Sequence, residues 1–227
     1  MSDAAPPAKP VRVWDIWTRL FHWSLVPLIA AAWWTAEKRD SFNGIEIHRL
    51  IGYAIIGLVV FRLYWGLVGS STARFAGFLK GPAAGFAYMK SLGGKHAPVL
   101  GHNAVGGWSV AAMLALVLAI VTLGLFTVDE DGIDPSPLAD KVSFELGRQI
   151  VEWHERLFWV LTGFIALHLA AIAFYAVVKR DNLVGPMITG ARGDLPQGAV
   201  MAPLWRAALG IAIAVAVAWG ASKGFKL

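Results

Sequence analysis

Residues 153–179, WHERLFWVLTGFIALHLAAIAFYAVVK, decide the fold. The stretch can cross a bilayer as a helix, because about 20 apolar residues span the hydrocarbon, and it carries His154 and His168. At about 1.5 Å and 100° per residue, these side chains stand about 21 Å apart along the helix and about 40° apart around it. One helix therefore presents two imidazoles to the same interior, one near each membrane surface. Ionisable groups in that setting indicate function.

The composition of the whole chain indicates an integral membrane protein. Of its 227 residues 57% are hydrophobic and only 15% are charged, and 11 are tryptophan, which is far from the composition of a soluble domain. No strand-like alternation of apolar and polar residues is evident, so we expect helical spans. Five segments reach or approach the required length: residues 14–36, 47–69, 104–128, 154–178 and 202–220.

The chain has no cysteine. This excludes disulfides, thiolate-bound iron–sulfur clusters and a covalently attached c-type haem, which needs a Cys-x-x-Cys-His motif. Any cofactor is therefore expected to be held by histidine. Residues 1–10, MSDAAPPAKP, are small, polar and proline-rich, and we expect them to form a disordered tail.

The charges of the loops predict the orientation of the spans. Residues 70–101 contain four basic residues and no acid, whereas residues 129–152 hold seven acids against two bases. Cytoplasmic loops carry the excess of lysine and arginine. We therefore expect the N-terminus, and the tail with it, to be cytoplasmic.

Two further histidines match those of the opening stretch in depth. His22 lies about one turn inside the apolar boundary of the first span, and His48 begins the second. In the expected topology His48 and His154 lie near the outer surface, and His22 and His168 lie nearer the inner one. Four intramembrane histidines thus fall into two pairs at two depths.

Taken alone, each histidine could simply form a hydrogen bond across a helix interface, but the matched depths favour two ligand pairs. Histidine binds iron, copper and zinc alike, and closed metal sites usually recruit carboxylate or thiolate ligands, which are missing from the interior of these spans. A bis-histidine haem needs only one imidazole on each face of the porphyrin. Two haems stacked across the membrane are therefore the economical interpretation. For His96 and His102, in or beside a basic loop, we expect surface or capping roles.

Six short motifs carry a family resemblance. They are V-W-D-x-x-T-R-x-F-H-W at 13–23, H-R-x-x-G-Y at 48–53, F-R-L-x-W-G at 61–66, G-H-N-x-x-G at 101–106, H-E at 154–155 and K-R-x-N-L-x-x-P-M-I-T-G at 179–190. Together they resemble the bacterial cytochrome b561 and nickel-hydrogenase b-type cytochrome family. The last motif is typical of the small stand-alone branch of that family.

This resemblance implies an all-α integral membrane protein, in which a four-helix transmembrane bundle holds two non-covalent b-type haems. The implied haem ligands are His22, His48, His154 and His168. Residues 11–192 would form this di-haem cytochrome b domain, and the bacterial inner membrane would be its location. The additional transmembrane helix expected at 202–220 departs from the minimal four-helix form.

Three arginines are the expected partners of the haem propionates, which need cationic or hydrogen-bonding groups. Arg19, one turn before His22, and Arg62, 14 residues after His48 and so at the inner level, suit the inner haem. Arg49 suits the outer haem. The alternative for Arg19 and Arg49 is a role as interfacial anchors.

The expected function is transmembrane electron transfer, because histidine on both faces of each iron leaves no open position for oxygen chemistry. As in the family, electrons are expected to pass between a membrane quinone and a periplasmic c-type cytochrome or redox enzyme. The chain would then act as a quinone oxidoreductase without a catalytic side chain, in a direction that the residues leave open. Membrane lipid is a further expected partner and nucleic acid is not.

Several alternatives stay open at this point. The chain could be the haem-bearing membrane anchor of a hydrogenase or dehydrogenase complex, a non-redox metal-binding membrane protein or a chlorophyll-binding bundle. It could also form a homodimer or belong to a larger complex. The acidic residues 129–152 lead directly to His154, and they are either a solvated connection or a surface that steers a basic electron carrier.

Overall fold

The computed structural model describes residues 10–38, 41, 43–94, 98–129 and 135–226. This part of the chain is mostly helical. Its α-helices are α1 (Ile16–Glu37), α2 (Gly44–Val68), α3 (Phe75–Phe78), α4 (Pro82–Ser91), α5 (Ala104–Gly124), α6 (Phe144–Phe174), α7 (Val184–Thr189) and α8 (Leu204–Ser222). A short 3-10 helix, η1 (Ala139–Lys141), precedes α6, and a π-helical turn, η2 (Tyr175–Lys179), continues it. The strands β1 (Val11–Arg12) and β2 (Ala191–Arg192) form one antiparallel pair.

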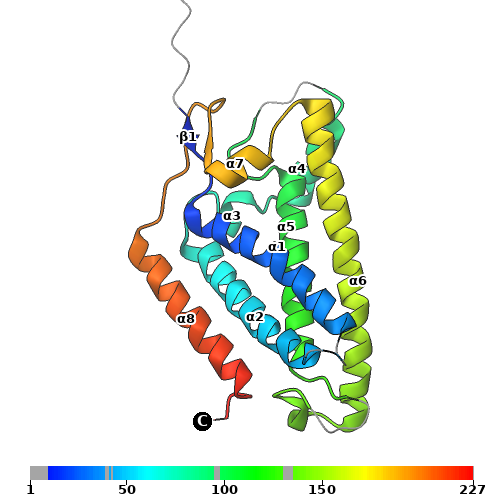
Figure 1. Ribbon diagram of the computed structural model, residues 1–227. Helices are drawn as coiled ribbons and strands as arrows, with labels where there is room; N and C mark the ends of the chain where they lie inside the picture. Colours follow the sequence, from blue (N-terminus) through cyan, green and yellow to red (C-terminus); the bar gives the residue numbers. More distant parts are fainter. Residues whose placement is uncertain (1–9, 39–40, 42, 95–97, 130–134, 227) are drawn as a thin grey trace, which may run out of the picture.

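The long helices form a bundle with an additional helix on one side (Figure 1). α1 packs on α2 and α5 packs on α6, while contacts between α2 and α5 join the two pairs. α8 packs on α2 outside this four-helix bundle. β1, α4 and α7 lie at one end of the bundle, which we call the N-terminal end. The connection between α5 and α6 and the last residues of the chain lie at the other, which we call the C-terminal end.

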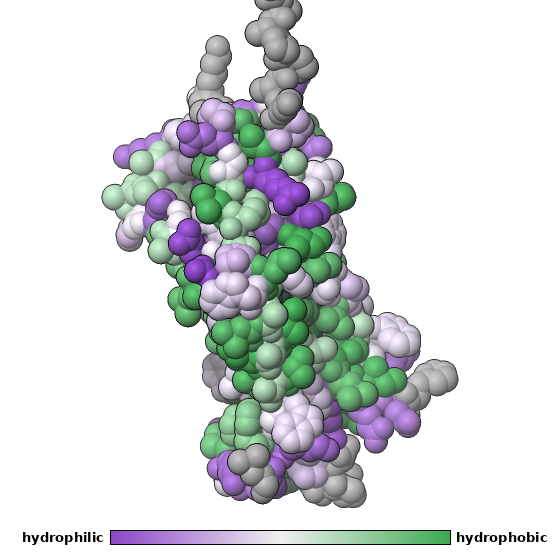
Figure 2. All heavy atoms as spheres, turned by 90° about the vertical axis from the view of Figure 1, so that its left-hand side faces the viewer, coloured by the Kyte–Doolittle hydropathy of each residue, from purple (hydrophilic) through white to green (hydrophobic). Residues whose placement is uncertain are grey.

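Four of the described helices are long and apolar enough to cross a membrane: α2, α5, α6 together with η2, and α8. α1 has 22 residues, which is also a spanning length at about 1.5 Å per residue; Arg19, His22 and four tryptophans reduce its hydropathy. Figure 2 shows a hydrophobic belt across the middle of the visible face, with polar residues gathered at both ends. The chain is therefore a multi-pass helical membrane protein, and the expected all-α membrane fold is confirmed.

Two helix boundaries differ from those expected from hydropathy. α6 begins at Phe144, about ten residues early, because the Ser143 hydroxyl caps it by accepting a hydrogen bond from the Leu146 N–H at 3.2 Å. Part of the acidic connection, including Glu152, is therefore helical. α5 ends at Gly124 rather than 128, where shorter backbone bonds such as Phe126 N–H to the Leu123 carbonyl tighten the last turn.

Proline and asparagine fix the helix starts around the basic segment before α5. α4 begins at Pro82, in the first helical turn, where the missing N–H of proline costs nothing. Asn103 caps α5, since its Oδ1 accepts a hydrogen bond from the Gly106 N–H at 2.7 Å. His96 lies outside the described residues.

The start of α1 is fixed by a buried carboxylate. Asp15 accepts a hydrogen bond from the Thr18 N–H at 2.8 Å, and the indole N–H of the fully buried Trp65 lies 3.2 Å from both carboxylate oxygens. This capping satisfies an otherwise unpaired N–H of the first turn. The N-terminal end is closed further by an ion pair between Arg192 and Asp194 at 2.6 Å, whose hydrogen bonds lower the pKa of Asp194.

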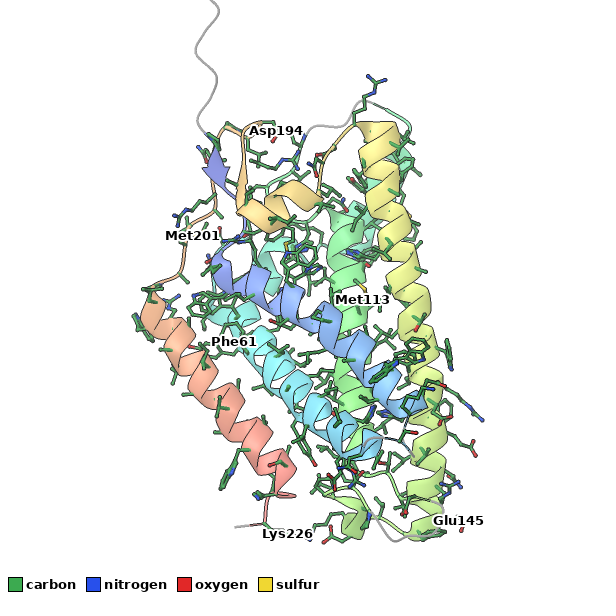
Figure 3. All side chains as sticks on the ribbon, viewed as in Figure 1. Phe61, Met113, Glu145, Asp194, Met201 and Lys226 are labelled. Carbon is green, nitrogen blue, oxygen red and sulfur yellow. The ribbon has the colours of Figure 1, made fainter. Side chains whose placement is uncertain are left out.

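Small residues allow α8 to lie close to α2. A side chain at Gly210 would stand 2.6 Å from the ring of Tyr64, and Gly57 of α2 faces Ala218 at 3.5 Å. After α8 the chain reaches the C-terminal end, where Lys226 pairs with Asp140 at 3.1 Å. A hydrogen bond from Lys226 lowers the pKa of Asp140. Figure 3 shows Lys226 and Glu145 at this end and Asp194 at the opposite one.

Candidate functional site

The four intramembrane histidines meet as two facing pairs. His22 of α1 faces His168 of α6 with ring centroids 6.4 Å apart, and we call these two residues the N-end pair. His48 of α2 faces His154 of α6 with ring centroids 6.1 Å apart, and we call these two the C-end pair. α6 thus contributes one imidazole to each pair, and the two helices packed together opposite it contribute the others. The pairing expected from depth is the pairing that the structure contains.

The spacing within each pair fits two imidazoles on opposite sides of one metal ion. A metal–nitrogen bond of about 2.0 Å and about 1.1 Å from that nitrogen to the ring centre, taken on both sides, give about 6.2 Å between centroids. The observed 6.1 and 6.4 Å agree with this value. The described residues contain no group of three or more histidine, cysteine or acidic side chains that could hold a metal ion. The donor set is therefore that of a bis-imidazole site and suits an iron porphyrin.

Backbone carbonyls orient both rings of the C-end pair. His48 Nδ1 lies 2.8 Å from the Ala32 carbonyl oxygen of α1, and His154 Nδ1 lies 2.9 Å from the Ile120 carbonyl oxygen of α5. A carbonyl can only accept, so each Nδ1 carries the proton and each Nε2 is left with its lone pair. This arrangement is typical of metal-binding histidines.

A glycine makes room for His154. A Cβ at Gly124 would stand 3.1 Å from His154 Cε1 and 3.4 Å from its Nδ1, which is tighter than ordinary contact. The close approach brings the imidazole within reach of the α5 backbone one turn earlier. Gly124 therefore belongs to the site, although hydropathy alone does not distinguish it from other helical glycines.

The C-end pair opens into a cavity of about 500 Å³ between α1, α2, α5 and α6. Arg49 lines it beside His48, which is where the sequence predicts this arginine. Glu37 of α1 and Glu155 of α6 also line the cavity and are exposed. The charges of this cavity are therefore mixed.

The N-end pair is covered by the segment that contains α7. The Trp23 indole N–H donates to the Met187 carbonyl at 3.1 Å, and Arg19 Nη1 donates to the Ile188 carbonyl at 2.5 Å. His22 lies edge-on to Trp23, with ring centroids 5.0 Å apart, and its Nδ1 is buried without a hydrogen-bond partner. These contacts connect the first and the last of the six sequence motifs, at 13–23 and 179–190. Carbonyls of α7, in the last motif, accept hydrogen bonds from the α1 residues on either side of His22, in the first.

Arg62 is buried at the N-terminal end, with only 3% of its surface exposed. Its guanidinium carbon lies 5.1 Å from the Phe75 ring centre and 5.9 Å from that of Phe78, within the range of cation–π attraction. The structure therefore places Arg19 and Arg62 at the end of the N-end pair and Arg49 beside the C-end pair.

His102 lies elsewhere than expected. Its ring is held between those of Trp14, at 4.8 Å, and Phe78, at 4.9 Å, and its Nδ1 is buried without a hydrogen-bond partner. It is neither a surface residue nor the cap of α5, which is Asn103. The sequence did contain a signal for this buried position. His102 comes immediately before the start of a helix, at the level of His22 and His168.

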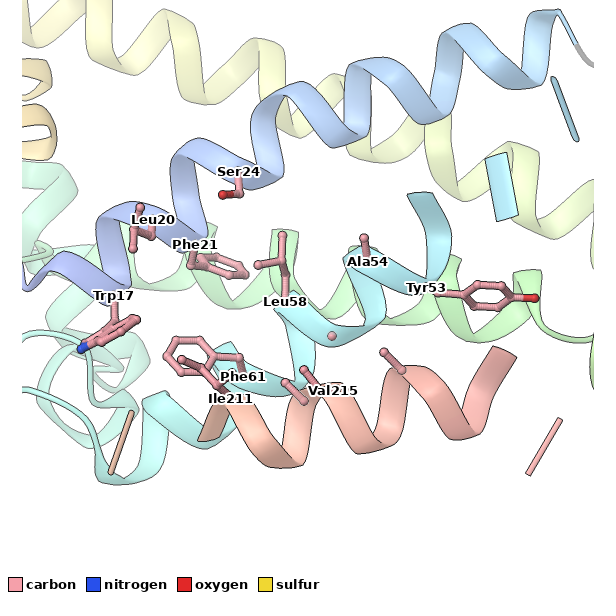
Figure 4. Close-up of a pocket in the computed structure, with 13 residues that line it drawn as sticks. Trp17, Leu20, Phe21, Ser24, Tyr53, Ala54, Leu58, Phe61, Ile211 and Val215 are labelled. Carbon is pink, nitrogen blue, oxygen red and sulfur yellow. The ribbon is translucent and has the colours of Figure 1, made fainter. Parts of the chain in front are cut away.

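A second hollow lies between α1, α2 and α8, away from the histidines (Figure 4). Its volume is about 350 Å³, and its walls are almost wholly apolar, with Trp17 and Phe61 towards one end and Tyr53 at the other. Such a groove on a membrane-spanning surface suits lipid chains. We assign it no chemical role.

The fold and the two histidine pairs define a multi-pass helical membrane protein of the kind that binds haem between its helices. Residues 13–190 match the prokaryotic cytochrome b561 family, and the chain belongs to this family of b-type cytochromes. Membership implies a b-type haem as cofactor.

Two relatives align with most of the chain. A probable Ni/Fe-hydrogenase B-type cytochrome subunit of Azotobacter chroococcum mcd 1 is 22% identical over 213 residues, which covers 80% of this chain and 88% of the relative. The probable Ni/Fe-hydrogenase B-type cytochrome subunit of Azotobacter vinelandii gives the same identity and coverage. No solved structure matches the chain.

Proposed function

We propose that the protein transfers electrons across the bacterial inner membrane through two bis-histidine b-type haems. The N-end pair would hold the haem near the cytoplasm and the C-end pair the haem near the periplasm, with the N-terminus cytoplasmic. The observation that carries the proposal is the presence of two imidazole pairs, each with the spacing of one bis-coordinated metal, joined by a single helix.

Bound haem would supply reversible one-electron chemistry at iron. The chain's own residues hold and shield it. The carbonyls of Ala32 and Ile120 keep the Nδ1 proton of the C-end histidines in place, which would leave Nε2 free to bind the metal. Arg49 would bind the propionates of the outer haem, and Arg19 and Arg62 those of the inner one. With a histidine on each face, a bound haem would have no coordination position for another ligand.

The redox partners belong to the same proposal. A quinone in the membrane and a periplasmic c-type cytochrome or redox enzyme are the partners we expect. The acidic connection between α5 and α6 is the candidate docking surface for the periplasmic one. Three of its acids, Glu130, Asp131 and Asp134, lie outside the described residues.

A second candidate function is favoured by the names of the relatives. Both are probable hydrogenase cytochrome subunits, so this chain could be the haem-bearing anchor of a hydrogenase or dehydrogenase complex. Both candidates use the same two sites. Co-purification of a hydrogenase or dehydrogenase subunit with the natively expressed protein would favour the anchor.

The haem content of the purified protein tests the proposal. Dithionite reduction should give a low-spin b-type spectrum, and the pyridine haemochrome assay should give about two haems per chain. His22→Ala or His168→Ala should remove one haem, and His48→Ala or His154→Ala should remove the other. The two groups of variants should be distinguishable by their low-temperature spectra.

Two results would contradict the proposal. A stoichiometry near one in the fully loaded wild type would mean that one pair does not bind haem. Loss of the same spectral component from His22→Ala and His48→Ala would mean that the pairs are wrongly drawn.

A further inference from the structure

Four buried side-chain nitrogens in the described part of the chain have no hydrogen-bond partner: Arg19 Nε, His22 Nδ1, Arg62 Nη1 and His102 Nδ1. All four belong to residues at the N-terminal end. Buried polar groups in folded proteins are nearly always paired, so this cluster indicates a ligand. His22 is a proposed iron ligand and Arg19 already donates to a carbonyl. Arg62 and His102 are the pair left to account for.

Aromatic rings hold the two residues side by side. Phe78 lies 5.9 Å from the guanidinium carbon of Arg62 and 4.9 Å from the ring centre of His102, so it contacts both. Each residue also contacts a second ring, Phe75 for Arg62 and Trp14 for His102. The heads of both side chains are therefore positioned before any ligand binds.

The backbone before α5 also positions His102. Gly101 has φ +83°, a left-handed conformation that glycine adopts without strain. A Cβ there would lie 3.2 Å from the side chain of Thr72. Glycine at 101 thus lets the chain turn sharply into the Asn103 cap.

The electrostatics of the pair suit an anion. Burial lowers the pKa of His102, and the nearby charge of Arg62 lowers it further, so His102 is a neutral imidazole that can donate one hydrogen bond. Asp15 is the acid whose charge acts on Arg62. Its hydrogen bonds from Thr18 and Trp65 occupy its oxygens but leave its charge in place, and with Arg19 at the same end these three charged groups remain net positive. One buried guanidinium and one neutral imidazole therefore lie on the same ring, that of Phe78, with His22 and His168 close enough to act on His102.

The C-end cavity differs in charge. Besides Arg49, two exposed acids line this cavity, Glu37 and Glu155. A buried positive charge acts through a low dielectric and is little screened, whereas exposed charges are weakened by water and salt. Positive charge beside an iron site favours the reduced state, in which the iron carries one positive charge fewer. The two sites should therefore differ in potential.

We propose that Arg62 and His102 form a carboxylate-binding pair for a propionate of the inner haem and make this haem the higher-potential one of the two. The inference rests on the two-haem proposal above. It adds His102 to the haem-binding residues and an order to the two potentials. Transfer of one electron from the outer to the inner site would then be downhill.

A spectroscopic redox titration of the purified wild-type protein tests the order directly. The haem component that disappears in His22→Ala identifies the inner haem, and its midpoint potential should be the higher of the two. Arg62→Gln should lower this midpoint and leave the outer one unchanged. His102→Phe keeps a ring between Trp14 and Phe78 but removes the donor, so it should lower the inner midpoint by a smaller amount.

Two further variants distinguish an effect of the Arg62 charge from a general effect of losing an arginine at this end. Arg62→Lys keeps the charge and should retain most of the wild-type midpoint. Arg206→Gln removes an arginine of α8 that donates to the Val68 carbonyl near the same end, and it should leave both midpoints unchanged. A resonance Raman shift of the inner haem's propionate modes in His102→Phe would report the lost hydrogen bond, which a packing role would not change.

The outcomes distinguish this inference from the proposed function. An inner midpoint below the outer one, or one that neither Arg62→Gln nor His102→Phe lowers, overturns the inference alone. Loss of the inner haem from Arg62→Gln but not from Arg62→Lys supports the carboxylate site, and loss from both contradicts it. A wild-type protein with fewer than two haems overturns the proposed function instead.

Discussion

At the scale of single residues, a glycine and two backbone carbonyls position the histidines of the C-end pair. Gly124 allows His154 to lie against the α5 backbone, where its Nδ1 reaches the Ile120 carbonyl. The same kind of carbonyl contact orients His48. The ligand geometry of the C-end pair therefore depends on backbone positions that carry no chemistry of their own.

This dependence gives the first prediction at the residue scale. Gly124→Ala would place a methyl group 3.1 Å from His154 Cε1, so the imidazole must shift away from its carbonyl partner. We expect weakened binding or a changed low-spin spectrum of the outer haem, with the inner haem unaffected. Haem quantification and electron paramagnetic resonance of the purified variant measure this.

The matched control is Gly163→Ala on α6, because a Cβ at that glycine meets nothing within 4 Å. Both changes substitute a helical glycine of a membrane span by alanine. Identical outer-haem signals in the two variants would show that the His154 contact does not set the site.

At the scale of helices, α6 and α8 have separate tasks. α6 carries a histidine of each pair, so its straight course between the two ends sets the separation of the sites. α8 carries no histidine and packs on α2 through Gly210, Ala207 and Ala214. We therefore expect α8 to stabilise α2 without holding a cofactor.

Gly210→Val tests the role of α8. The added Cβ would lie 2.6 Å from Tyr64, and overpacking of this kind typically costs about 1–3 kcal/mol. We expect a lower thermal unfolding temperature in detergent with haem content per folded chain unchanged. Leu209→Val, at a half-exposed neighbouring position, should change neither quantity. Loss of haem from folded Gly210→Val protein would make α8 part of the haem-binding unit.

At the scale of the whole molecule, the two ends differ in charge and in the loops they expose. The N-terminal end carries α4 with Lys90, and the C-terminal end carries the acidic start of α6 with Glu145. The excess of basic residues at the N-terminal end predicts that it faces the cytoplasm. The names inner and outer for the two proposed haems follow from this orientation.

Single cysteines at two exposed positions test the orientation. The natural chain contains no cysteine, so Lys90→Cys and Glu145→Cys have no background. An impermeant thiol reagent should label Glu145→Cys in cells whose outer membrane is permeabilised, and Lys90→Cys only after the inner membrane is opened as well. The reverse pattern would exchange the inner and outer assignments.

The sequence by itself determined the membrane class, the approximate spans and the two depths of the four histidines. These features depend on composition and on spacing within one helix, such as the 14 residues between His154 and His168, and helical geometry is the same wherever the helix lies. The motifs also indicated the family, which the match over residues 13–190 shows.

Only the tertiary structure decided which groups surround the histidines. The Ala32 carbonyl meets His48, and Phe78 meets both Arg62 and His102, through contacts between segments that no local period connects. The early start of α6 at Ser143 likewise depends on a polar cap rather than on hydropathy. Hydropathy records which residues prefer the membrane. The packing of one helix on another decides which of them face each other, because that choice depends on the shapes of both surfaces at once.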